Sequence, residues 1–145
     1  MDKVAATNIM SRVFIATGFT YFIIGTTLIT AKLLGAISID NDPIFLMDLY
    51  GFVTLMIFGL SYIFVPGLSR TRFASPKIII LEYVLLNAGI VLIESVLMLK
   101  LGGPVALVAG ASALIAAVLL HVFNMLRIML FKDAKPAGVR NNASD

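Results

Sequence analysis

The sequence predicts an all-α integral membrane protein: a four-helix bundle that crosses the bilayer up-down-up-down, with both termini in the cytoplasm. Three observations predict this fold class. First, the 145-residue chain is 60% hydrophobic and only 13% charged, whereas soluble domains are about half apolar and a quarter charged. Second, four apolar stretches are long enough to cross a hydrocarbon core of about 30 Å. Third, the basic residues fall mainly on one side of the resulting topology.

The four expected helices cover residues of about 13–34, 43–65, 76–99 and 104–131. Three of them begin at or near a proline (Pro43, Pro76 and Pro104), which suits the first helical turn because that turn needs no backbone N–H. The Val-Pro-Gly sequence that starts at Val65 is expected to end the second helix. Their length and the lack of alternating polarity exclude buried strands and a β-barrel.

The segments outside the helices give the expected domain organisation. The first apolar run is too long for a cleaved signal peptide, so we expect it to be retained. Residues 1–131 are expected to form one membrane domain. Residues 132–145 are polar and are expected to form a flexible cytoplasmic tail.

Basic residues predict the orientation. The N-terminal segment, the second loop and the C-terminal end carry nine of them, and the opposite side carries two. The nine are Lys3, Arg12, Arg70, Arg72, Lys77, Arg127, Lys132, Lys135 and Arg140, and the two are Lys32 and Lys100. This asymmetry predicts that the side with nine is cytoplasmic. The net charge of +3 is therefore a topology signal, and nucleic acid is not an expected partner.

Small residues are expected to hold the helices together, because lipid removes the hydrophobic drive between them. On the fourth stretch, small residues at spacings of four, three and four form one stripe: Ala106, Gly110, Ala113 and Ala117. We predict that this stripe is a helix contact face. Alanine and glycine are also simply common in membrane helices, which is the alternative explanation.

Polar side chains inside a membrane are costly, so each is a candidate for function or for internal pairing. The predicted topology sorts them into two layers. Lys32, Asp48, Glu94 and Lys100 are expected near the outer face, Glu82, His121, Asn124 and Arg127 near the inner face, and Asn87 between them.

Asp48 and Glu94 are the candidate metal ligands, since two carboxylates at similar depth could hold a cation or share a proton. The alternative is that Asp48 interacts with the N-terminus of its own helix and with Lys32. Asn87 and Glu94 lie seven residues apart on one helix face, which is therefore expected to face protein.

In the inner layer, Glu82 is expected to pair with His121 or with Arg127, and His121 shares a helix face with Asn124. A structural pair is one reading of these residues. A proton relay or a haem ligand at His121 is the other, although a haem usually requires a second axial ligand.

The remaining chemistry is limited. The chain has no cysteine and a single histidine, which excludes thiolate chemistry and any intrachain site with two imidazoles. No phosphate-binding loop, metalloprotease motif or serine elbow is present. No catalytic residue and no cofactor of its own is therefore predicted.

The second stretch carries a partial family resemblance. It reads DLYGFVTLMIFGLSYIFVP from Asp48 to Pro66. The Gly-Phe pair at Gly51, the second glycine at Gly59 and the final aromatic and proline resemble a helix of the catalytic subunit of haem–copper oxidases and nitric oxide reductases. Histidines just before the glycine hold haem in that family, and residues 44–48 contain no histidine here. The resemblance therefore implies a small haem-less derivative, with the scaffold retained and no ligand role at any position.

Three functions remain as hypotheses. The first is a small non-catalytic accessory subunit of a larger membrane oxidoreductase, a respiratory oxidase or a copper membrane monooxygenase, with haem or copper in the partner subunits. The second is a haem-binding or electron-transfer protein that uses His121. The third is an oligomeric transporter or channel component with Asp48, Asn87 and Glu94 along its path. The expected partners are other integral membrane subunits and lipids.

Overall fold

A computed structural model describes residues 3–69 and 75–130 of the chain. Every regular element in these ranges is a helix: α1 (Lys3–Leu33), α2 (Asn41–Leu46), the π-helix η1 (Met47–Thr54), α3 (Leu55–Ser69), α4 (Pro76–Leu99) and α5 (Gly103–Leu130). Four helical segments are long and apolar enough to cross a membrane, namely Ala5–Leu33, Asn41–Leu68, Pro76–Leu99 and Gly103–Leu130. The all-α class and four candidate spans are therefore confirmed. The predicted tail at 132–145, and Arg70 and Arg72, lie outside the described residues.

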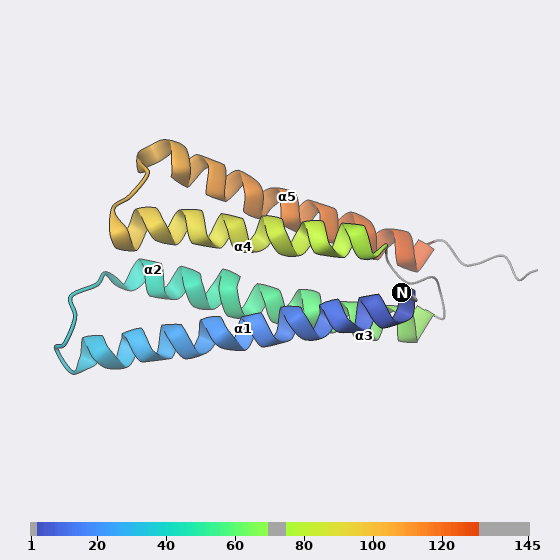
Figure 1. Cartoon of the computed structure of the whole chain (residues 1–145), viewed down its shortest axis with the longest axis horizontal. Coiled ribbons are helices and arrows are strands. Elements are labelled where there is room, and N and C mark those ends of the chain that lie inside the picture. The colour runs from blue at the N-terminus through green and yellow to red at the C-terminus, as the bar shows by residue number, and fades with distance from the viewer. Residues whose placement is uncertain (1–2, 70–74, 131–145) are drawn as a thin grey trace, which may run out of the picture.

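The helices form two hairpins, which can be followed in Figure 1. α1 packs along η1 and α3, and α4 packs along α5. The two hairpins meet where α5 contacts α3 and where α4 contacts α1 and η1. The short connections at 34–40 and 100–102 lie at one end of the molecule, and the N-terminus lies at the other (Figure 1).

α1 begins ten residues earlier than the sequence predicts. Its first turns contain polar residues, which hydropathy counts against a span, but Thr7 and Ser11 are fully buried. The Ser11 hydroxyl donates to the Thr7 carbonyl at 3.0 Å, which satisfies it inside its own helix. A Cβ at Gly59 of α3 would lie 3.0 Å from the Ser11 carbonyl oxygen, so the two helices approach closely here. Packing against α3 therefore extends α1.

The second span also continues past its predicted end. Pro66 lies inside α3, which runs to Ser69, so the expectation that the Val-Pro-Gly sequence stops the helix was wrong. A proline this close to a helix end removes one backbone hydrogen bond of the last turns, and the helix can close around it. The same span contains η1, an unusually long π-helical segment that includes Asp48. The Thr54 hydroxyl donates to the Leu49 carbonyl at 3.0 Å within it.

α4 and α5 cross at two glycines. A Cβ at Gly89 would lie 2.9 Å from the Gly110 carbonyl oxygen, and a Cβ at Gly110 would lie 3.0 Å from that of Gly89. Of the predicted small-residue stripe on α5, Gly110 and Ala117 are buried, and Ala106 and Ala113 are partly buried. The tight crossing of α4 and α5 follows from the absence of side chains at Gly89 and Gly110.

Lys100 adopts a left-handed conformation with φ 56° that ends α4.

Candidate functional site

The strongest candidate site is a buried polar cluster where α3, α4 and α5 meet. We call it the His121 cluster, and it consists of Ser61, Tyr62, Glu82, His121 and Asn124. Tyr62, Glu82 and Asn124 are at most 2% exposed, and His121 is 6% exposed. Ser61 and Tyr62 belong to the first hairpin and the other three to the second, so the cluster joins the hairpins.

The Glu82 carboxylate is the centre of the cluster. Its Oε2 accepts from the Tyr62 hydroxyl at 2.5 Å and lies 3.0 Å from His121 Nδ1. Its Oε1 accepts from Asn124 Nδ2 at 3.3 Å, and the same Nδ2 donates to the Tyr62 hydroxyl at 2.8 Å. A buried carboxylate with three donors around it has replaced its hydration by protein groups, which is what makes its burial tolerable.

Both ring nitrogens of His121 and one face of its imidazole ring contact other side chains. Its Nε2 lies 2.9 Å from Ser61 Oγ, opposite the contact of Nδ1 with Glu82. The Phe58 ring stacks on the imidazole, with centroids 3.7 Å apart and planes 9° from parallel. A haem iron needs a free imidazole nitrogen. Because both nitrogens already have partners, a haem at His121 would first have to displace Ser61 or Glu82, and the geometry does not fit that role.

The structure places the predicted inner-layer residues as follows. Glu82, His121 and Asn124 come together, whereas Arg127 is exposed. Among the described residues, the polar partners of Glu82 are Tyr62, His121 and Asn124. Sequence reasoning missed Ser61 and Tyr62. Their signal in the sequence is a Ser-Tyr pair inside the second apolar stretch, near its C-terminal end.

A second polar region joins α1 to α4. Hydrogen bonds join Thr17, Tyr21, Tyr83 and Asn87, and we group with them the buried carboxyl oxygens of Asp48 on η1 and Glu94 on α4 under the name Asp48 layer. The Thr17 and Tyr83 hydroxyls lie 2.8 Å apart. The Tyr21 hydroxyl donates to Asn87 Oδ1 at 3.2 Å, and Asn87 Nδ2 donates to the Tyr83 carbonyl at 2.9 Å. The polar face of α4 that includes Asn87 thus meets α1.

The two carboxylates of the Asp48 layer are less well satisfied. Asp48 Oδ1 and Glu94 Oε2 are buried and have no hydrogen-bond partner among the described residues. Asp48 lies so close to α1 that a Cβ at Gly25 would overlap with its Oδ1. Glu94 is 8% exposed. In the described ranges no three histidine, cysteine or acidic side chains gather as a metal site would require, so the predicted cation site has no third ligand of this kind.

The two lysines of the predicted outer layer, Lys32 and Lys100, lie at the ends of α1 and α4. Lys32 Nζ donates to Asn41 Oδ1 at 2.6 Å, across the 34–40 connection, rather than to Asp48. Lys100 is exposed at the end of α4. Both lysines are therefore at the end of the bundle where the two short connections lie (Figure 1).

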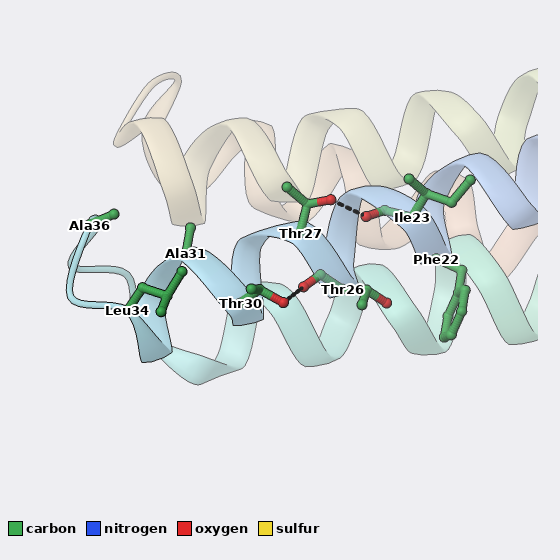
Figure 2. Close-up of a pocket in the computed structure, with 8 residues that line it drawn as sticks. All are labelled: Phe22, Ile23, Thr26, Thr27, Thr30, Ala31, Leu34 and Ala36. Atoms are coloured by element: carbon green, nitrogen blue, oxygen red, sulfur yellow. Dashed lines mark hydrogen bonds between the residues drawn. The ribbon is translucent and has the colours of Figure 1, made fainter.

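The outer face of α1 carries a shallow apolar groove, shown in Figure 2. It is lined by Phe22, Ile23, Thr26, Thr27, Thr30, Ala31, Leu34 and Ala36. The hydroxyls of Thr27 and Thr30 donate to the carbonyls of Ile23 and Thr26, at 2.7 and 2.9 Å. Because these hydroxyls are satisfied within α1, the groove presents mainly methyl and ring carbon.

Similarity to known proteins gives no further guide to the site. No family model matches the chain, and searches of curated proteins and of solved structures found no match. The resemblance of the second span to the haem–copper oxidase catalytic subunits therefore stays a prediction. Two of the residues that carry it have packing roles, since Gly51 lies against Tyr21 and Gly59 against Phe14 and Ile15.

Proposed function

We propose that the protein is a small non-catalytic subunit of a larger membrane oxidoreductase complex, in which any haem or copper is held by partner subunits. The observation that carries the proposal is the saturated His121 cluster. Both nitrogens of the chain's one histidine are engaged by Ser61 and Glu82. The chain therefore offers a rigid scaffold and no vacant imidazole for a cofactor.

The groove on α1 is the proposed contact with a helix of a partner subunit. The first span is the least buried of the four, at 17%, against 22% in α5 and 39% in α4. Threonine and alanine, which line the groove, are residues that membrane helices use where they approach one another closely. The close approach of a partner helix would account for this lining.

In this proposal the bundle is up-down-up-down, and both termini and the connection at 70–75 face the cytoplasm of a cell membrane. The basic residues support this orientation, since positive charges are retained on the cytoplasmic side. The 34–40 and 100–102 connections would then face outwards, with Lys32 and Lys100.

Native purification tests the proposal. The complex is extracted in a mild detergent, and the co-migrating chains are identified by mass spectrometry and checked for haem and copper. We expect a defined stoichiometry with a larger cofactor-bearing membrane subunit. A chain that migrates alone, or only with copies of itself, would contradict the proposal.

Cysteine cross-linking locates the contact, because the natural chain has no cysteine to give background. Thr27→Cys, in the groove, is expected to cross-link to the co-purified subunit. Val122→Cys on the exposed face of α5 is the matched control and is expected not to do so.

A cation or proton transporter component is the second candidate, favoured by Asp48 Oδ1 and Glu94 Oε2, which are buried and have no hydrogen-bond partner among the residues that the structure describes. Several copies would be needed to enclose a path. Ion flux into proteoliposomes that falls on Glu94→Gln, with folding unchanged, would support this function over the first.

A further inference from the structure

The hydrogen bonds of the His121 cluster assign the hydrogens around Glu82. The Tyr62 hydroxyl has one hydrogen, which it donates to Glu82 Oε2, and its oxygen accepts from Asn124. Asn124 also donates to Glu82 Oε1. Both carboxylate oxygens are thus acceptors, which is the arrangement of an ionised carboxylate. With Glu82 ionised, His121 Nδ1, 3.0 Å from Oε2, carries a hydrogen and donates it.

The other ring nitrogen faces a hydroxyl with two possible acceptors. Ser61 Oγ lies 2.8 Å from the Phe58 carbonyl oxygen and 2.9 Å from His121 Nε2. If the Ser61 hydrogen points at Nε2, the imidazole is neutral. If it points at the Phe58 carbonyl, Ser61 Oγ is free to accept from an Nε2–H, and the ring is an imidazolium. Each arrangement leaves every one of these groups hydrogen-bonded.

The charge of the cluster favours the arrangement with the extra hydrogen. In the part of the chain that the structure describes, the titratable groups that face His121 are Tyr62 on α3 and Glu82 on α4, while Arg127 on α5 is exposed. Without the added proton the buried cluster carries the single negative charge of Glu82; with it, the charges of Glu82 and His121 cancel. A neutral ion pair is cheaper to bury than one isolated charge. Phe58 also offers its π-face to the ring, which attracts a cation.

We propose that Ser61, Glu82 and His121 form a site inside the membrane span that binds one proton. The proton comes from water and adds to Nε2 of the neutral imidazole. Nδ1 keeps its hydrogen bond to the Glu82 carboxylate, and the Ser61 hydroxyl rotates from Nε2 to the Phe58 carbonyl. No other bond forms or breaks. This proton site goes beyond a scaffolding function, since a subunit that only joins helices needs no exchangeable proton.

Nuclear magnetic resonance of the full chain, labelled with ¹⁵N-histidine and held in mild detergent, tests the proposal. The chain has one histidine, so both ring signals are assigned at once. At the acid end of the pH range in which the fold is stable, we expect both ring nitrogens to carry hydrogen. As the pH is raised, Nε2 alone should lose its hydrogen, so that the neutral ring is the Nδ1–H form. A neutral ring with its hydrogen on Nε2, or a ring that never changes form, would overturn the proposal.

A matched pair of serine variants separates the proton site from a structural role. Ser61→Ala removes the partner of Nε2 and is expected to change the pH range over which Nε2 loses its hydrogen, because the lost bond is stronger to the charged ring. Ser95→Ala is the control, since Ser95 also bonds a carbonyl three residues earlier, at 2.8 Å, but lies outside the cluster. It should leave the midpoint unchanged. Equal midpoints in Ser61→Ala, Ser95→Ala and the parent would overturn the role of Ser61 in the site.

Discussion

The His121 cluster and the Asp48 layer both join the two hairpins with polar side chains, but they satisfy those side chains differently. Around Glu82, every carboxylate oxygen has a donor from another residue. In the Asp48 layer, Asp48 Oδ1 and Glu94 Oε2 are buried and have no hydrogen-bond partner within residues 3–69 and 75–130. Glu94 is twelve residues after Glu82 on α4, about 18 Å along the helix axis. One helix thus carries a satisfied carboxylate and an unsatisfied one.

The difference shows that burial alone does not reveal the role of an intramembrane carboxylate. Glu82 is fully buried and Glu94 is 8% exposed, so the two are alike by that measure. What separates them is the number of donors within reach. We expect Glu82 to stabilise the fold and Glu94 to cost stability, which leaves Glu94 available for another purpose.

The largest effect is expected for Glu82→Gln. It removes the charge that three donors surround and puts an amide N–H₂ among them, so we expect a loss of about 3–5 kcal/mol in the free energy of unfolding. The measurement is denaturant unfolding in mixed micelles, followed by far-ultraviolet circular dichroism. A loss below about 1 kcal/mol would show that the cluster does not hold the hairpins together.

The next effect concerns Gly25. A methyl group there would overlap with Asp48 Oδ1, so Gly25→Ala must move α1 or the Asp48 side chain, at a cost of about 1–3 kcal/mol. Gly67→Ala is the matched control, because a Cβ at this helical glycine meets nothing within 4 Å. The control should be neutral or slightly stabilising, as alanine favours a helix. Equal stabilities of the two variants would mean that the Asp48 side chain turns aside without loss, and would contradict the expectation that its place against α1 stabilises the fold.

A smaller effect is expected where one hydroxyl is removed. Tyr21→Phe deletes the bond to Asn87 Oδ1 and should cost about 0.5–1 kcal/mol, the usual range for a hydrogen bond between membrane helices. Tyr50→Phe, in η1, is the comparison, since no hydrogen bond of the Tyr50 hydroxyl is present in the described structure. Thermal unfolding of both variants in the same detergent measures this difference. A larger loss of stability in Tyr50→Phe than in Tyr21→Phe would contradict the prediction.

The smallest effect is expected for Glu94→Gln. Removing a buried carboxyl that lacks one partner should leave stability unchanged or raise it by up to about 1 kcal/mol. The same unfolding assay as for Glu82→Gln gives the comparison directly. A loss of several kcal/mol would place Glu94 in a satisfied network like that of Glu82.

The sequence predicts the helical class and the four spans well, because these depend on local apolar length. α4 covers Pro76–Leu99, the same residues as the predicted third helix. The bounds of α1 and α3 could not be predicted, since they depend on contacts between distant residues. Ser11 is buried because Gly59 lets the helices approach, and Pro66 is tolerated only because it lies near the end of α3.

The candidate site is predicted in part. Helical spacing and equal depth bring Glu82, His121 and Asn124 to one level, and the structure places them together. The same argument predicts Arg127 at this level, but its side chain is exposed. Tyr62 escaped prediction because its contact with Glu82 depends on how α3 is rotated relative to α4, which the residue pattern does not show.

A double-mutant cycle across the two hairpins tests the central claim most directly. Tyr62→Phe and Glu82→Gln are combined, and Tyr62→Phe with Glu94→Gln serves as the distant control. Unfolding free energies should show a coupling of about 1–3 kcal/mol in the first cycle and additivity within about 0.5 kcal/mol in the second. Additive effects in the first cycle would contradict the claim that the His121 cluster joins the hairpins inside the membrane.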